Sequence, residues 1–243
     1  MVANVVQTGR LGNLTTEELK AEVLLLVQNR DSDPLNEKVA FSKNELAPYF
    51  EELQRRNPYP VVEDQIPVVL GVWTPIWSTI PFHDILPGRL HDCSYQIFFE
   101  NGYYANVARY APGSRFKFMD KFLAAYDFMV MQKFEIRDGE WFIQNVTIEQ
   151  ALRWRALPLT IDRAEAWFHK VLDAKIDQFN QKTALPQELK LENVDKQTLK
   201  KIEKTYLATP KFDHLYVDET FRLVKTQREA KQRPSYTIAV RRK

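Results

Sequence analysis

The order of apolar and polar positions divides this 243-residue chain into a helical beginning and a longer, strand-rich part. Residues 15–18 (TTEE) supply a helix N-cap with acids in the first turn. The apolar residues that follow are spaced for one helix face: Leu19, Val23, Leu26 and Val27. Ser42 is expected to cap a second helix whose apolar face is Leu46, Tyr49, Phe50 and Leu53. Pro58 and Pro60 end that helix and start a linker.

Strand patterns begin near residue 68. Residues 68–77 are rich in β-branched and aromatic side chains, and Pro75 makes this an edge strand or a bulged one. Asn101–Gly102 and Asp138–Gly139 tolerate positive φ, so each predicts the turn of a β-hairpin. The hairpin arms are residues 94–100, 103–110, 128–136 and 140–148, with weaker strand character over 152–157.

A further helix and a last group of strands complete the pattern. Residues 162–179 carry apolar side chains three to four positions apart, namely Ala166, Trp167, Val171, Leu172 and Ile176, which predicts a helix. Strands are then expected at 205–207, 215–225 and 235–241.

Helices that precede consecutive antiparallel hairpins indicate an α+β fold: a β-barrel or strongly curled sheet with helices packed outside. We expect residues 1–60 to form a helical region that packs on the barrel. Residues 61–243 would be the barrel domain, with a helix inserted near 162–180.

Composition removes several classes of protein. The chain has seven glycines, none at the spacing of a dinucleotide or P-loop phosphate cradle. Its single cysteine, Cys93, excludes an internal disulfide and Cys-rich metal sites. Residues 1–10 lack a secretory pattern, and no apolar run approaches the roughly 20 residues of a spanning helix.

Catalytic patterns are weak. His83–Asp84 and His91–Asp92 flank a Pro–Gly loop and are candidates for a metal site or a general base. Adjacent residues on a strand point to opposite faces, so neither pair forms a ready dyad. Cys93 lacks the pattern of a nucleophile. We therefore assign no catalytic residue, no metal and no cofactor beyond a bound apolar ligand, and a hydrolase or metal enzyme using the His83/His91 region remains a third alternative.

Aromatic residues are concentrated between positions 73 and 128, where 14 of the 30 lie. Such a set either fills a core, the default interpretation, or lines a cavity for a large apolar ligand. Aromatics interleaved with basic residues also suit single-stranded nucleic acid, but the near-neutral net charge of +2 argues against that partner.

Positive charge is concentrated at the carboxyl end. Residues 222–243 hold eight Lys or Arg and one acid, Glu229. A basic end on an acidic body suits an anionic membrane or an acidic partner, whereas a solvated edge strand is the plain structural interpretation. The candidate contact residues are Arg228, Lys231, Arg233, Arg241, Arg242 and Lys243.

Four segments resemble the plastid-lipid-associated protein (fibrillin) family. They are residues 18–25 (ELKAEVLL), 52–60 (ELQRRNPYP), 70–73 (LGVW) and 215–225 (LYVDETFRLVK), in the order in which the family carries them. The chain departs from the family pattern at residues 73–77 (WTPIW) and 228–230 (REA). The absence of a transit peptide leads us to expect a cyanobacterial-type member, although a trimmed plastid protein would look the same.

The resemblance implies a lipocalin-like β-barrel that binds an isoprenoid, carotenoid, quinone or lipid without catalysis. Its expected place is the cytoplasm or the surface of the thylakoid or of lipid globules (stroma and thylakoid for a plastid protein), with a photoprotective or structural role. The expected ligand-binding residues are Trp73, Trp77, Tyr95, Ile97, Phe99, Tyr104, Phe128, Asp218 and Arg222.

Two further interpretations remain. An Asp218–Arg222 pair that joins the closing strands is the structural reading of those two residues. The alternative function is an interaction or assembly factor for a photosynthetic membrane complex or for a prenylquinone-synthesis enzyme.

Overall fold

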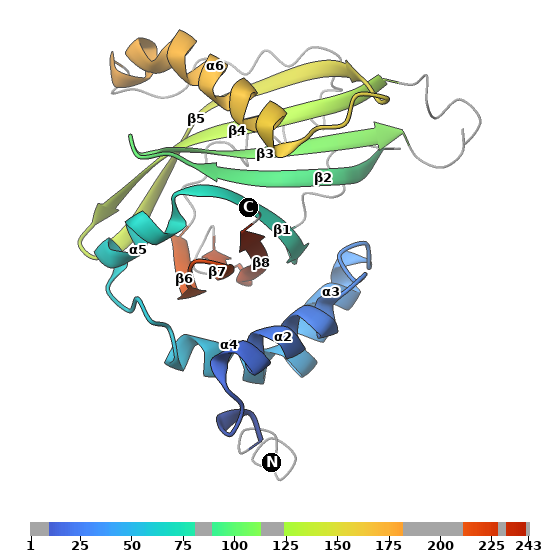
Figure 1. The fold of residues 1–243 in the computed structure, drawn as a ribbon, viewed down its shortest axis with the longest axis vertical. Helices are drawn as coiled ribbons and strands as arrows, with labels where there is room; N and C mark the ends of the chain where they lie inside the picture. The colour runs from blue at the N-terminus through green and yellow to red at the C-terminus, as the bar shows by residue number, and fades with distance from the viewer. Residues whose placement is uncertain (1–9, 81–88, 113–123, 182–210, 228–231, 242–243) are drawn as a thin grey trace.

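A computed structural model describes residues 10–80, 89–112, 124–181, 211–227 and 232–241. Within these residues the fold is α+β: eight antiparallel strands in sequence order form one strongly curled sheet that closes into a ring, and helices cover its outside (Figure 1). The strands are β1 Gly71–Ser78, β2 Arg89–Phe98, β3 Tyr103–Pro112, β4 Ala124–Arg137, β5 Glu140–Trp154, β6 Lys211–Val217, β7 Phe221–Gln227 and β8 Ser235–Arg241.

The first predicted helix is confirmed as α2, Thr16–Val27. Thr15 accepts a hydrogen bond from the Glu18 backbone N–H, and the Glu18 carboxylate accepts one from the Thr15 N–H, which is a capping box. This arrangement satisfies two backbone donors at the helix start.

The second helix is longer than its sequence pattern indicates. Ser42 is not an N-cap, because α3 (Leu35–Phe41) runs into a π-helical turn, η1 (Ser42–Leu46), and then into α4 (Ala47–Arg55). The apolar residues expected on one face, Leu46, Tyr49, Phe50 and Leu53, are all buried.

A further short helix, α5 (Val62–Val69), occupies what the sequence indicates as linker, with Pro67 inside it. The first strand consequently begins at Gly71. The expected segment 205–207 lies outside the described residues.

Both predicted hairpins are confirmed. Gly102 (φ +81°) turns β2 into β3, while Asp138 (φ +53°) and Gly139 (φ +70°) turn β4 into β5. The predicted third helix is α6, Ile161–Gln181, which lies across β2–β5 (Figure 1). The expected single strand over 215–225 is in fact two strands, β6 and β7, because Asp218, Glu219 and Thr220 form a turn between them.

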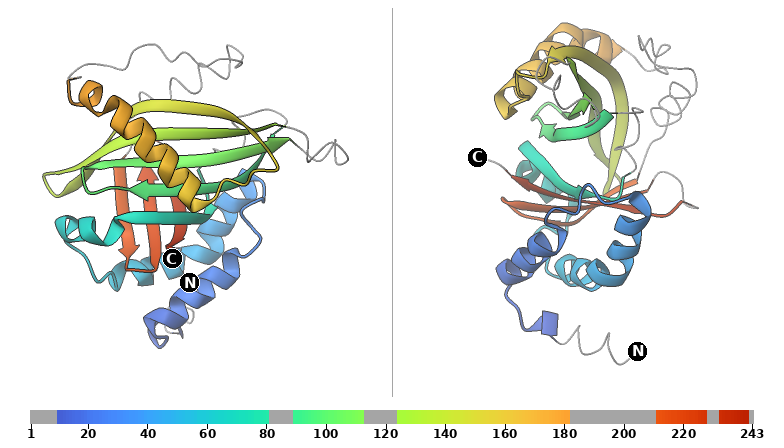
Figure 2. Two further views of the ribbon diagram at one scale, coloured as in Figure 1. Left: turned by 45° about the horizontal axis from the view of Figure 1, so that its top comes forward. Right: turned by 90° about the vertical axis from the view of Figure 1, so that its right-hand side faces the viewer.

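The number of paired residues differs greatly between neighbouring strands of the ring. β4 pairs with β5 from Ala124 to Arg137, but β1 pairs with β2 only over Gly71–Trp73, and β5 pairs with β6 only at Trp141–Phe212. The sheet therefore consists of two groups of strands, β2–β5 and β6–β8 with β1, which meet at one end of the ring (Figure 2).

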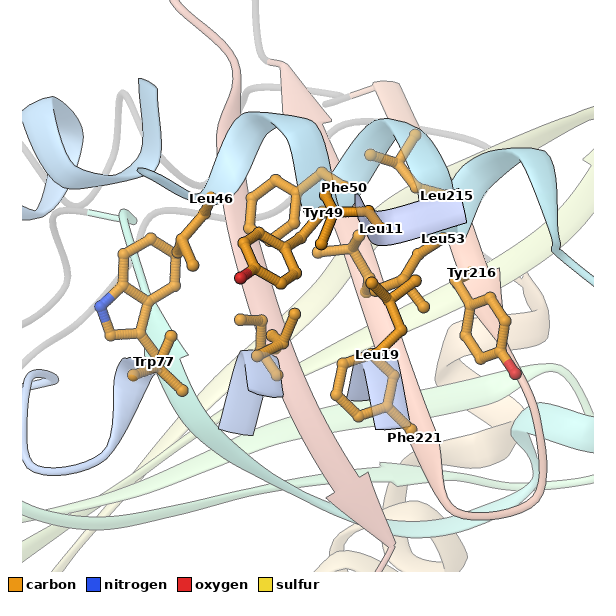
Figure 3. Close-up of a cluster of buried hydrophobic side chains, with 14 residues drawn as sticks. Leu11, Leu19, Leu46, Tyr49, Phe50, Leu53, Trp77, Leu215, Tyr216 and Phe221 are labelled. Carbon is orange, nitrogen blue, oxygen red and sulfur yellow. The ribbon is translucent and has the colours of Figure 1, made fainter. Parts of the chain in front are cut away.

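Three hydrophobic clusters hold this arrangement together. The first packs α2 and α4 against the outer face of β6–β8, with Leu19, Phe50 and Phe221 among its members (Figure 3). The second packs α6 against the outer face of β2–β5, through residues such as Phe168 and Met129. The third lies inside the ring, where residues of both strand groups meet.

The β6–β7 turn ties the N-terminal helices to the ring. The Asp218 carboxylate accepts hydrogen bonds from Lys20 Nζ (2.6 Å) and the Tyr216 hydroxyl (2.8 Å), and also from the backbone N–H groups of Thr220 and Phe221. Lys20 and Asp218 are both buried, although they stand 198 residues apart in sequence. No described helix is long and apolar enough to cross a bilayer.

Replacing Asp218 by Ala should therefore destabilise the protein by about 2–4 kcal/mol, because two turn N–H groups lose their acceptor and the buried Lys20 keeps only its ion pair with the exposed Glu17. Urea unfolding followed by circular dichroism measures the loss. Asp213→Ala, at an exposed carboxylate on β6, is the matched control and should change the unfolding free energy by less than about 0.5 kcal/mol. Equal effects of the two substitutions would contradict this account of the turn.

Candidate binding site inside the ring

The inner side of the ring is organised in layers along the strands. Strand register and alternation place Phe98, Tyr104, Phe134 and Trp141 on this side at the joined end. Their rings contact one another, with Phe98 stacked on Tyr104 at a centroid distance of 4.6 Å and Phe134 tilted against Trp141 at 5.5 Å. Aromatic side chains therefore fill the joined end of the ring.

A polar layer comes next. Four amide side chains form a hydrogen-bonded row across β2, β3, β4 and β5: Gln96, Asn106, Gln132 and Asn145. In each link the NH₂ group donates to the next side-chain oxygen, at 2.9, 2.8 and 2.5 Å in turn. Arg222 Nη2 donates to the Gln96 oxygen at 2.8 Å. Because a guanidinium only donates, it fixes the orientation of Gln96 and, through it, that of every later amide.

Arg222 is the charged member of this layer and is fully buried. Its guanidinium carbon lies 4.6 Å from the ring centroid of Phe98 and 5.1 Å from that of Trp73, so it is held between aromatic faces. Nε and Nη1 are buried and have no hydrogen-bond partner among the described residues. Burial lowers the pKa of Arg222 to about 9, because the charged form has lost its hydration.

His214 on β6 is a second buried polar group on the inner side. Gln65 Oε1 accepts from Trp141 Nε1 at 2.9 Å and lies 3.1 Å from His214 Nδ1. An amide oxygen only accepts, so His214 carries its proton on Nδ1, and Nε2 is an acceptor with no partner among the described residues. Burial, with the Arg222 charge nearby, holds the pKa of His214 well below 6.5, so the ring is neutral.

Beyond the polar layer the inner face is apolar and accessible. On β4 the residues that face α6 (Ala125, Asp127, Met129, Met131) are fully buried, whereas the ring-facing Tyr126, Phe128 and Val130 are only half-buried. Ile148 on β5 is also half-buried, and Leu152 and Trp154 are 64% and 71% exposed. The inner face is therefore more accessible than the face covered by the helix, although interiors of closed sheets are normally the more buried side.

The expected ligand residues fall on both sides of the sheet. Trp73 and Tyr104 lie inside the ring and are buried, and Phe128 lies on its accessible inner face. Tyr95 and Ile97 point outward to α6, where the Tyr95 hydroxyl donates to the Leu159 carbonyl at 3.0 Å.

The remaining two aromatics also lie outside the ring. Phe99 contacts Phe168 and His169 of α6 and is 37% exposed. Trp77 is buried under the N-terminal helices, edge-on to Phe41, because a bulge at Pro75 reverses the side that it faces. The aromatic and apolar residues expected to form one ligand site therefore lie on opposite faces of the sheet.

The expected Asp218–Arg222 ion pair is wrong. Asp218 faces outward and binds Lys20, whereas Arg222 faces inward and binds Gln96. The two residues are separated by the β6–β7 turn, and strand alternation places them on opposite sides of the sheet.

Two of the six candidate membrane or partner contacts, Arg233 and Arg241, lie among the described residues. Arg241 donates to the carbonyls of Glu219 (2.7 Å), Leu70 (2.5 Å) and Val68, and its guanidinium carbon lies 4.3 Å from the Trp73 ring centroid. It therefore joins the end of α5, just before β1, to the β6–β7 turn. Arg233 is exposed. Arg228, Lys231, Arg242 and Lys243 lie outside the described residues.

The described residues do not bring the catalytic candidates together into a site. His83 and Asp84 lie outside it; His91 contacts the Tyr110 ring, and Asp92 is exposed. Burial raises the pKa of the Cys93 thiol to about 11, so it is protonated at neutral pH. Among described residues no three His, Cys, Asp or Glu side chains are grouped as metal ligands.

Sequence reasoning missed the amide row and His214. A sequence feature that could have predicted the amide row is the recurrence of an amide residue on each of four successive apolar strands: Gln96, Asn106, Gln132 and Asn145. Such residues are costly in a core unless they bond to one another, so their recurrence on successive strands indicates a network.

Comparison with known proteins adds no assignment. No family model matches this chain, and no curated protein matches it either.

The buried His214 should make stability depend on pH. Its pKa is lowered in the folded state, so the unfolded chain binds more protons below pH 6.5, and stability falls as pH falls through that value. His214→Gln removes this titration. The difference in unfolding free energy between wild type and variant should therefore change in favour of the variant from pH 7.5 to 5, as measured by urea denaturation. A difference independent of pH would show that His214 is not buried as a neutral ring.

Proposed function

We propose that this protein is a non-enzymatic binding protein for a small hydrophobic molecule, an isoprenoid, carotenoid, quinone or lipid, which lies on the inner face of β2–β5. The observation that carries the proposal is the burial pattern of β4. The side chains that face α6 are fully buried, whereas the aromatic side chains that face the interior of the ring are partly exposed. An accessible apolar face inside a curled sheet is the usual form of a small-molecule site.

The lining of this face suits a flat or elongated apolar ligand. Phe128 lies between Tyr126 (ring centroids 5.5 Å apart) and Tyr110 (6.3 Å), and Val130 and Ile148 continue the surface toward the amide row. Removing about 200 Å² of apolar surface from water contributes about 5 kcal/mol before the costs of association. Eight antiparallel strands in sequence order, with β1 beside β8, support the lipocalin-like character that the family resemblance implies.

The membrane part of the proposal rests on a groove outside the ring. About 440 Å³ lies between the N-terminal helices and β6–β8, over Phe50, Leu215 and Tyr236. Three cations line it, Lys43, Lys225 and Arg233, with one acid, Glu51. The π-helical turn η1 contributes Ser42 and Lys43 to this wall, and such turns occur often at functional sites. We propose that this face meets the anionic surface of the thylakoid membrane or of lipid globules.

The same groove favours the second candidate function, an interaction or assembly factor for a photosynthetic membrane complex or a prenylquinone-synthesis enzyme. An apolar floor with a basic rim also suits an acidic amphipathic segment of a partner. The two candidates differ in whether lipid alone is sufficient for binding.

Replacing Phe128 by Gln should weaken binding of the neutral fluorophore Nile red about tenfold, because the ligand loses an aromatic contact on the inner face. Fluorescence titration measures the dissociation constant. Phe99→Gln, at an aromatic on the opposite side of the sheet, is the matched control and should leave the constant unchanged. The proposal fails if the wild-type protein does not bind the dye or if both variants bind as it does.

Charge reversal in the groove should abolish binding to anionic vesicles. We expect the wild type to float with phosphatidylglycerol vesicles at low salt, to be released as salt rises, and to ignore phosphatidylcholine vesicles. The double variant Lys43→Glu, Arg233→Glu should not float. The control Lys133→Glu, Lys211→Glu has the same net charge, altered at exposed sites on β4 and β6, and should float. A wild type that ignores vesicles but retains a stoichiometric protein partner, lost in the groove variant, would support the second candidate instead.

A further inference from the structure

We infer that Arg222 receives the head group of the ligand, and that the ring takes an amphiphile whose polar end is an anionic oxygen group. This inference rests on the proposed function and adds to it the chemical class of the ligand. A fatty carboxylate is the simplest molecule of this class, and an alkyl phosphate is the other source of the same chemistry.

The first argument is the unpaired charge. Arg222 is fully buried, and Nε and Nη1, which carry most of the donors of a guanidinium, meet no acceptor in the described part of the protein. Its one hydrogen bond goes to the neutral Gln96. Buried cations are normally paired, because an uncompensated charge is costly in a low-dielectric interior.

The electrostatic surroundings make an anion the natural complement. The titratable groups that act on Arg222 are the Tyr104 hydroxyl, which is protonated at neutral pH, and the Arg241 guanidinium, while His214 is neutral. No described Asp or Glu forms an ion pair with Arg222. Within the described residues, the inner layer therefore carries positive charge without a counter-charge.

Arg241 is a second guanidinium beside the Trp73 ring, and its hydrogen bonds can be compared with those of Arg222. It contacts the same Trp73 ring, but its three nitrogens each donate to a backbone carbonyl. Joining strands thus requires no unpartnered donors, and the free Nε and Nη1 of Arg222 have no such structural use.

The amide row gives Arg222 a fixed position without neutralising it. Gln96 holds Nη2, and Asn106, Gln132 and Asn145 hold Gln96 in turn. The half-buried Val130 and Ile148 come next along β4 and β5, so an apolar chain on that face ends beside this layer. A donor held in advance costs little ordering when the ligand binds.

The test compares three ligands of one chain length, hexadecanoate, hexadecyl phosphate and hexadecanol, by displacement of Nile red. We expect the wild type to bind at least one of the two anions about tenfold or more tightly than the alcohol, and the preferred anion distinguishes the two sources. Arg222→Met should lose that preference and bind the acid, the phosphate and the alcohol with similar affinity. Equal affinity for acid, phosphate and alcohol in the wild type, or an unchanged preference in the variant, would overturn the inference and leave the proposed function standing. Failure of every ligand and of the dye would remove both.

Thermal unfolding of the ligand-free protein separates a binding role from a structural one. Removing an unpaired buried charge should leave the Tm of Arg222→Met unchanged or raise it, whereas Arg241→Met, which frees three carbonyls, should lower it. A fall in Tm for Arg222→Met as large as that for Arg241→Met would assign Arg222 to structure. Gln96→Glu is a second variant that keeps the arginine and supplies an internal carboxylate. It should fold and lose the preference for anions, and a retained preference would contradict the inference.

Discussion

A guanidinium on the inner side of a closed sheet constrains every group around it. Arg222 lies fully buried between the rings of Trp73 and Phe98, and its bond to Gln96 sets the direction of a row of amides across four strands. The polar layer that results divides the interior. Aromatic rings fill the space on the joined side, and the accessible apolar face lies on the other. The interior therefore has a polar layer at a fixed height along the strands, and in the function proposed above this layer would orient an amphiphilic ligand.

The distribution of helices explains why one face of the sheet stays available. α2 and α4 seal the outer side of β6–β8, and α6 seals the outer side of β2–β5, so the large clusters of the core lie outside the ring. The fold obtains much of its hydrophobic stabilisation from helix–sheet contacts and does not depend on filling the interior throughout. Lys20 and Asp218 fix the first of these contacts, and Arg241 fixes the end of α5 against the β6–β7 turn.

Local sequence chemistry predicted the local structure well. The capping box at Thr15, the turns at Asn101–Gly102 and Asp138–Gly139, the helix near 162–180 and the last strand all follow from residue type and spacing. The misses have physical causes. Ser42 resembles a cap but continues a helix through a π-helical turn, and the bulge at Pro75 turns Trp77 outward.

The site was harder to predict because its residues come from five strands. Alternation correctly grouped Tyr95 and Ile97 on one face of the sheet, but only helix packing decides which face is the outside. The partner of Asp218 stands 198 residues away, so no local pattern points to Lys20. Arg222 and Asp218 stand close in sequence and on opposite faces, which is why a pairing inferred from proximity was wrong.

Segments that are far apart in the sequence but paired in the structure also determine the order in which the parts of this protein can fold. β1 pairs with β8 over residues such as Trp73 and Arg241, and α2 buries its apolar face against strands that follow it much later in the sequence, with Lys20 and Asp218 198 residues apart. The N-terminal helices therefore leave the ribosome long before the surface that covers them exists. The β2–β5 hairpins, whose contacts are local, are the part able to form first, and closure of the ring is a late, high-contact-order step. During that interval the apolar faces of these helices are without the strands that cover them in the folded protein.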